Sequence, residues 1–65
     1  MKKTRLWAIK IRYLESQYDG DGKWHQHTTS WHSDSNSAWQ EAEEYQNQFN
    51  YNWIECGSSL LRKEV

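Results

Sequence analysis

The residue pattern of the segment 5–15, RLWAIKIRYLE, constrains the fold more than any other part of the chain. Every second position carries an apolar or aromatic side chain: Trp7, Ile9, Ile11 and Tyr13. Lys10 and Arg12 fall between them. Successive side chains of a β-strand point to opposite faces of its sheet. The segment therefore predicts a strand with one buried face and one face that displays the two basic residues.

The next two segments predict a hairpin. Residues 16–23, SQYDGDGK, contain Asp-Gly, a strong turn signal because glycine adopts a positive φ without a Cβ clash. The segment 23–33, KWHQHTTSWHS, then forms a second strand that pairs antiparallel with the first.

The number of loop residues decides which face of this second strand is buried, since a one-residue slip exchanges all side chains between the faces. An even number turns one set of side chains inward: Trp24, Gln26, Thr28, Ser30 and His32. An odd number turns the other set inward: His25, His27, Thr29 and Trp31. Neither set is apolar enough to decide, so both registers stay open. In both, at least one tryptophan lies near solvent.

The segment 38–49, AWQEAEEYQNQF, predicts an amphipathic helix. Its apolar positions fall at i, i+4, i+7 and i+11 and form one stripe, with Trp39 at its border: Ala38, Ala42, Tyr45 and Phe49. Asp34 or Ser35 is a suitable N-cap, and we expect the helix to end near Asn50.

The last segment, 51–65, begins as a strand with Ile54 and Cys56 on one face and Trp53 and Glu55 on the other. Gly57-Ser58 could close a second hairpin that places Leu61 opposite Ile54 and Arg62 opposite Trp53. Alternatively, residues 58–65 form a loose tail or continue the strand through a bulge.

Together these elements predict an α+β fold with a small antiparallel sheet, ββαβ or ββαββ, and one amphipathic helix packed on one face. The 65 residues should form a single domain, 1–65. A chain of this length buries only about 60% of the surface that it exposes when unfolded, so we expect marginal stability. Aliphatic residues are few, so five tryptophans, four tyrosines and one phenylalanine must supply much of the core.

No residue pattern predicts catalysis, a metal site or a cofactor. His32-Ser33-Asp34 are neighbours in sequence, which does not place a nucleophile and a base within hydrogen-bonding distance. His25-x-His27 offers two metal ligands on one strand face, but the local sequence lacks a third and a fourth. We therefore expect solvent-facing histidines. Cys56 is the only cysteine, so we expect no disulfide within the chain and interpret this thiol as a small buried residue.

Membrane insertion is not predicted. Lys10 and Arg12 interrupt the apolar residues near the N-terminus, and no stretch approaches the roughly 20 apolar residues of a membrane span. A lone thiol suits a reducing compartment, so we expect a cytoplasmic protein.

The aromatic content predicts a non-catalytic protein-binding module. Tryptophan, tyrosine and arginine are common at interface hot spots, and exposed strand edges accept a strand from a partner or from a second copy. We expect a protein partner and a homo-oligomer. The predicted partner-binding residues are Lys10, Arg12, Trp24, Trp31, Glu41, Glu44 and Trp53. An alternative is a single-stranded nucleic-acid binder that uses Lys10, Arg12 and the same rings, although the net charge of −1 opposes it.

The order of strand, glycine-containing hairpin, strand, capped helix and strand is similar in size and build to many very small phage and mobile-element proteins. These include inhibitors of host defence complexes. The resemblance implies a steric mechanism, in which a sheet face or an acidic helix face occupies a surface that the target uses for another ligand. Helix residues Glu41, Glu43 and Glu44 could in this way compete for a basic nucleic-acid channel.

Overall fold

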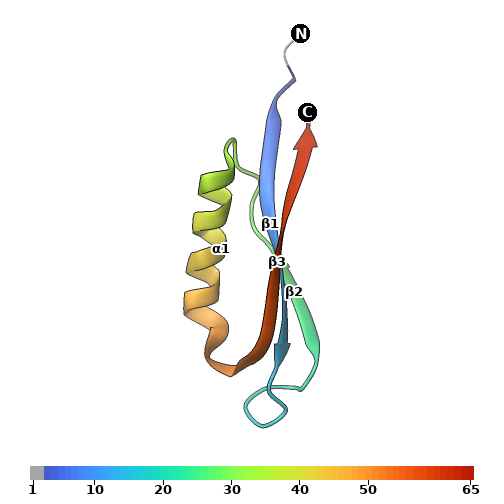
Figure 1. Ribbon diagram of the computed structural model, residues 1–65, viewed down its shortest axis with the longest axis vertical. Helices are drawn as coiled ribbons and strands as arrows, with labels where there is room; N and C mark the ends of the chain where they lie inside the picture. The colour runs from blue at the N-terminus through green and yellow to red at the C-terminus, as the bar shows by residue number, and fades with distance from the viewer. Residues whose placement is uncertain (1–2) are drawn as a thin grey trace.

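The computed structural model describes residues 3–65, which form one antiparallel sheet with a helix on one side (Figure 1). The elements follow in chain order: β1 (Arg5–Glu15), β2 (Trp24–Thr28), α1 (Ser35–Phe49), the 3-10 turn η1 (Asn50–Asn52) and β3 (Trp53–Glu64). The sheet order is β2-β1-β3, and both pairings are antiparallel. The predicted α+β fold is confirmed in its ββαβ form.

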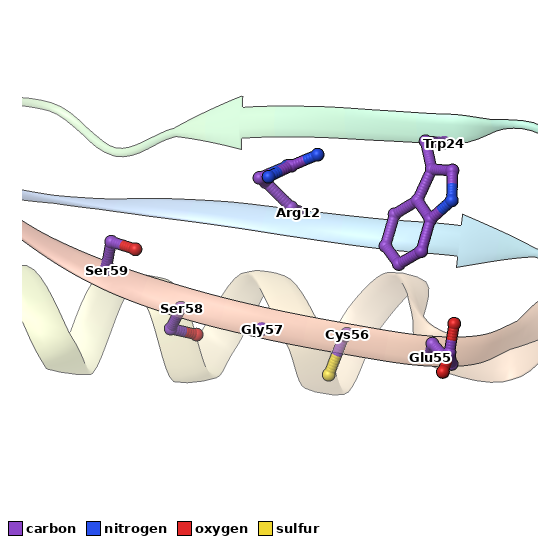
Figure 2. A pocket seen from close by; sticks show the side chains of 7 residues that line it. All are labelled: Arg12, Trp24, Glu55, Cys56, Gly57, Ser58 and Ser59. Carbon is purple, nitrogen blue, oxygen red and sulfur yellow. The ribbon is translucent and has the colours of Figure 1, made fainter.

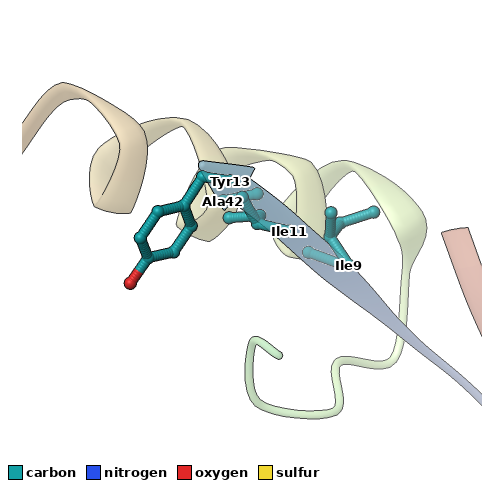
Figure 3. Close-up of a cluster of buried hydrophobic side chains, with 5 residues drawn as sticks. Ile9, Ile11, Tyr13 and Ala42 are labelled. Atoms are coloured by element: carbon teal, nitrogen blue, oxygen red, sulfur yellow. The ribbon is translucent and has the colours of Figure 1, made fainter. Parts of the chain in front are cut away.

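The core lies between β1 and α1. Ile9, Ile11 and Tyr13 point from alternate positions of β1 towards the helix, as the sequence pattern predicts (Figure 3). They meet Ala38 and Ala42, whose small side chains are fully or almost fully buried and let the helix approach the strand closely. Ile9 and Ile11 are the largest fully buried side chains in the described residues, so the core is thin.

The ends of α1 agree with the sequence prediction. Asp34 is the N-cap, and its Oδ1 accepts the backbone N–H of Ser37 at 2.7 Å. At the other end the N–H of Asn50 bonds to the carbonyl of Gln46, and the helix stops. The apolar stripe is buried only in its first half, because Phe49 keeps 42% of its surface exposed.

β2 is shorter than the predicted strand over 23–33. Beyond Thr28 the register shifts by one residue, and His32 then pairs with Trp7 as an isolated bridge. Thr29 still donates its N–H to the Ile9 carbonyl, and its hydroxyl oxygen accepts the Ile9 N–H at 2.9 Å. A side chain therefore satisfies a backbone donor of β1 at the position where regular strand pairing ends.

The histidines of β2 face the helix, contrary to the expected solvent-facing position. Glu15 bonds to the carbonyl of Lys23, which leaves residues 16–22, an odd number, in the loop. His25 consequently stacks on Tyr13 and His27 on Tyr45, at centroid distances of 5.4 and 3.8 Å.

β3 runs as one strand through the predicted second hairpin. It pairs with β1 from Glu15↔Trp53 to Arg5↔Glu64, so Gly57 lies in mid-strand opposite Arg12. Of the alternatives left open for residues 58–65, the second hairpin at Gly57-Ser58 is wrong and the continued strand is present, because continuous pairing satisfies the backbone of β1 along its whole length.

Two predicted side-chain positions on β3 were also wrong. Ile54 is an extra residue at a register shift beside Leu14, which rotates Trp53 to the helix side of the sheet, where it stacks on Tyr13 at 4.0 Å. Cys56 is exposed, because the helix covers β1 and leaves this strand largely open.

Candidate partner-binding face

One face of the sheet carries no helix, and we call it the open face (Figure 1). The strand registers place Lys10 beside Ser59 and Arg12 beside Gly57 on this face. Trp24 lies on the same side, opposite Leu14 of β1. Both predicted basic residues and one predicted tryptophan therefore share one surface.

Each tryptophan of the second-strand region contacts a cation. The guanidinium of Arg12 lies 5.8 Å from the centre of the Trp24 ring, and Lys63 Nζ lies 4.3 Å from that of Trp31. Arg12 on β1 thus meets a ring from β2, whereas Lys63 comes from β3. Such contacts hold the cation over the electron-rich face of the ring.

Trp31 reaches the open face because of the register shift after Thr28. His32 bonds to Glu41 on the helix side, and Lys63, the contact of Trp31, pairs with Leu6 on the opposite side. The Trp31–Lys63 contact bridges β1, which explains why Ala8 is fully buried although it points away from the helix. Neither register considered from the sequence places both tryptophans outward; the shift does so.

A shallow groove of about 560 Å³ lies next to Trp24 (Figure 2). Arg12, Trp24 and the β3 segment 55–59 line it. Gly57 forms its floor, and a Cβ there would meet no atom within 4 Å. The groove therefore offers bare strand backbone flanked by an aromatic ring, a guanidinium and the carboxylate of Glu55.

Glu41, another predicted site residue, is engaged within the molecule. Its carboxylate accepts the N–H of Ser30 at 3.0 Å and lies 2.7 Å from His32 Nε2. Burial raises the pKa of Glu41, but the hydrogen bonds from His32 and Ser30 outweigh this effect and lower the pKa overall. Glu41 fastens the segment before the helix to α1.

The predicted site residues do not form a single surface. Lys10, Arg12, Trp24 and Trp31 lie on the open face, whereas Glu44 is exposed on α1 and Trp53 is half-buried against Tyr13. Sequence reasoning missed Lys63. If residues 53–64 had been interpreted as one continuous strand, Lys63 would have fallen on the same face as Leu61 and Ser59.

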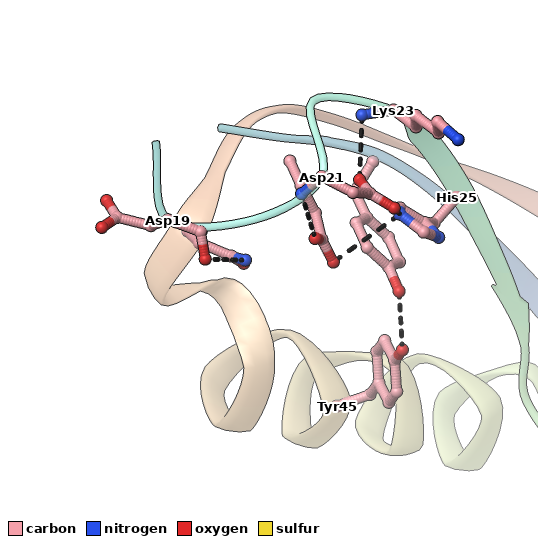
Figure 4. Close-up of polar contacts among 8 residues, drawn as sticks. Asp19, Asp21, Lys23, His25 and Tyr45 are labelled. Carbon is pink, nitrogen blue, oxygen red and sulfur yellow. Dashed lines mark hydrogen bonds and ion pairs between the residues drawn. The ribbon is translucent and has the colours of Figure 1, made fainter. Parts of the chain in front are cut away.

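One group of side chains at the base of the β1–β2 loop has the composition of a metal site (Figure 4). Donor atoms of Glu15, Asp21 and His25 lie within 4.8 Å of one another. His25 Nε2 is 2.8 and 2.9 Å from the two oxygens of Asp21 and 3.8 Å from Glu15 Oε2. One nitrogen and two carboxylates could hold a divalent ion.

The same three side chains also hold the loop without a metal. The hydrogen bond from His25, followed by that from the Lys23 N–H, lowers the pKa of Asp21. Gly20 lies so close to Glu15 and Asn52 that a Cβ would collide with both side chains. Asn52 completes the attachment, because its side-chain amide donates to the carbonyl of Asp19 at 3.3 Å. The cluster therefore has a structural role in the loop.

Within residues 3–65 no helix is long and apolar enough to cross a membrane. When compared with models of protein families, with curated proteins and with solved structures, the chain shows no significant match. Conclusions about its function therefore rest on the geometry of the open face.

Proposed function

We propose that the protein is a non-catalytic binding module that docks its open face on a protein partner and sterically blocks the covered surface. The observation that carries this proposal is the pair of tryptophans on the open face. Trp24 and Trp31 remain 52% and 38% exposed, each beside a cation. Exposed tryptophan with neighbouring arginine or lysine is typical of the centre of a protein interface.

The energetics of the open face favour a bound state. A tryptophan side chain buries about 150–250 Å² when it is covered, and apolar area contributes roughly 25 cal/mol per Å². Lys10, Arg12 and Lys63 outnumber Glu55 on this face, so an acidic partner surface would complement its charge. The molecule measures 52 by 17 by 13 Å, so it offers a long, narrow contact area.

Two further features belong to the same proposal. Steric blocking needs no catalytic group. It is also the mechanism that the resemblance in size and build to small phage and mobile-element inhibitors implies. We place the protein in the cytoplasm, where its exposed thiol, Cys56, stays reduced. We also propose that it is a homo-oligomer, because β3 is a long edge strand that can accept a further strand.

Tryptophan substitutions with a matched control test the open-face proposal. Trp24→Ala and Trp31→Ala should each weaken binding at least tenfold to a partner recovered from the source cells, as measured by isothermal titration calorimetry. Trp39→Ala should leave the affinity unchanged, because Trp39 is 44% exposed on α1. Circular dichroism should show that all three variants keep the fold. Equal losses in the three variants, or no loss at Trp24 and Trp31, would refute the proposal.

A single-stranded nucleic acid is the second candidate ligand, and the cation beside each ring favours it. Unpaired bases stack on exposed aromatic rings while neighbouring arginine and lysine contact the phosphates. Fluorescence anisotropy with a labelled oligothymidylate should then show an affinity that falls steeply with added salt. It should also fall in Trp24→Ala and Trp31→Ala. Absence of binding at low salt would exclude this ligand.

A further inference from the structure

The free edge of β3 is the longer of the two sheet edges in the part of the chain that the structure describes. β3 pairs with β1 on one side only, and its twelve residues are exposed except for the half-buried Trp53 and Leu61. The opposite edge strand, β2, has only five residues. Native proteins usually protect long edges with proline, charged side chains or a bulge. This chain has no proline, the register shift at Ile54 lies at the start of β3, and the middle of the strand, residues 56–61, carries no charged side chain.

Strand geometry identifies the backbone groups on this edge. In an antiparallel pair, residues alternate between those that hydrogen-bond to the neighbouring strand and those that point away from it. Thr4 and Val65 exchange both N–H···O bonds, at 3.0 and 2.9 Å. Counting back from Val65, the residues that direct their N–H and C=O groups to the free edge are Cys56, Ser58, Leu60, Arg62 and Glu64.

We propose that two copies of the chain pair β3 with β3, antiparallel, about a two-fold axis that passes through Ser59. The two sheets then join into one, with both helices on the same side. This inference rests on the proposed homo-oligomer and does not depend on the partner of the open face. The occupant of the free edge is therefore a second copy of this chain.

Charge selects this register. In an antiparallel pair about a two-fold axis normal to the sheet, residues that lie opposite each other point to the same face. The axis must therefore pass through a residue, such as Ser58, Ser59 or Leu60, and cannot pass between two residues. With the axis at Ser59, Glu55 lies opposite Lys63 of the second copy, and symmetry repeats the pair. An axis at Ser58 places Glu55 opposite Leu61, and an axis at Leu60 places Lys63 opposite Gly57. Both alternatives separate the two charges, whereas opposite charges across strands stabilise a pairing.

Shape supports the same register. The axis at Ser59 places Leu61 of the second copy opposite Gly57, with Cα atoms about 4.5 Å apart, as in any pair that lacks direct hydrogen bonds. Gly57 forms the floor of the groove beside Trp24, and no atom lies within 4 Å of the position that a Cβ at Gly57 would take. A leucine side chain would fill it. No like charges face each other, since Cys56 meets Arg62 and Ile54 meets Glu64.

Disulfide trapping tests the register in a Cys56→Ser background. Ser59→Cys places two thiols opposite each other, within the Cα range of about 4.4–6.8 Å that a disulfide requires. We expect rapid formation of a covalent dimer under mild oxidation. Ser58→Cys is the matched control and should oxidise slowly. In the proposed register position 58 lies opposite position 60 of the second copy, so the two cysteines at position 58 are only diagonal neighbours. Faster trapping at position 58, or equal rates at both positions, would overturn the register.

Charge reversal tests the same pairing without cysteines. Light scattering should give a dimer mass for the unmodified chain and a monomer mass for Glu55→Lys, which brings two lysines together across the edge. The double variant Glu55→Lys/Lys63→Glu restores opposite charges and should restore the dimer. A dimer in the single variant, or a monomer in both variants, would contradict the proposed pairs.

A proline variant distinguishes edge pairing from other modes of association. Ser58→Pro removes an N–H that points to the free edge and should give a folded monomer, whereas Ser59→Pro removes a bond to β1 and should disrupt the sheet. Trp24→Ala and Trp31→Ala should remain dimeric. A monomeric unmodified chain at high concentration, or a dimer that survives Ser58→Pro, would refute pairing at this edge while leaving the open-face proposal untouched.

Discussion

Tyr13 joins every layer of the molecule through its ring and its hydroxyl. The ring stacks on Trp53 of β3 at 4.0 Å and on His25 of β2 at 5.4 Å. The hydroxyl lies 3.2 Å from that of Tyr45 on α1. In a chain with few aliphatic residues, one aromatic side chain thus makes contacts that several leucines would make elsewhere.

The phenol of Tyr13 should ionise late. Its hydrogen bond with Tyr45, followed by burial, raises its pKa from 10.0 to about 12. Because the folded state holds the neutral form, this contribution to stability is complete below pH 10 and disappears as the pH approaches 12. Ultraviolet titration should show a late phenolate phase that Tyr13→Phe removes. The control Tyr51→Phe, at a site 81% exposed, should keep the late phase. A late phase that persists in Tyr13→Phe would contradict its assignment to Tyr13.

At the level of elements, local sequence predicted β1 and α1 because their signals are complete within each segment. Alternation defines β1, and the Asp34 cap begins α1. The faces of the β2 region could not be predicted in the same way. They depend on the shift after Thr28, which contacts from β1 and α1 stabilise through Thr29 and Glu41.

The cap of α1 should contribute measurably to stability. Asp34→Ala removes the acceptor for the Ser37 N–H and should lower the urea midpoint of unfolding without changing its slope. Asp34→Ser can still accept this bond and should recover most of the loss. Asp19→Ala, a change at an exposed loop residue outside the helix, should have little effect. An equal loss in Asp34→Ser would show that the hydrogen bond is not the cause.

The contact between Glu41 and the segment before the helix should make stability depend on acidity. The folded pKa of Glu41 lies below its ordinary value of 4.5, so its contribution is present above that pH and is lost as the pH falls through the folded pKa. In Glu41→Gln the loss of stability between about pH 5 and pH 3 should be smaller than in the unmodified chain. Glu44→Gln, on the exposed side of the same helix, should follow the unmodified chain in urea unfolding at each pH.

For the whole molecule, composition correctly predicted that aromatic rings supply part of the core, but it did not predict the course of β3. Gly57-Ser58 is a turn signal when read locally, whereas the eleven residues of β1 provide a continuous edge along which β3 can pair. That pairing is a property of the assembled sheet. The free edge follows from this pairing, and the open face remains because the single helix packs on the other side of the sheet, mainly against the central strand.

The thin core makes the stability of the molecule depend on very few side chains. A chain of this length is expected to have a free energy of unfolding of about 3–10 kcal/mol, and removing a buried isoleucine side chain costs about 2–5 kcal/mol. Ile11→Ala should therefore leave much of the protein unfolded, as measured by urea denaturation. Ile54→Ala makes the same chemical change at a site 63% exposed and should cost within about 0.5 kcal/mol. Comparable costs at the two sites would mean that Ile54 is covered in solution and that the stable unit is larger than one chain.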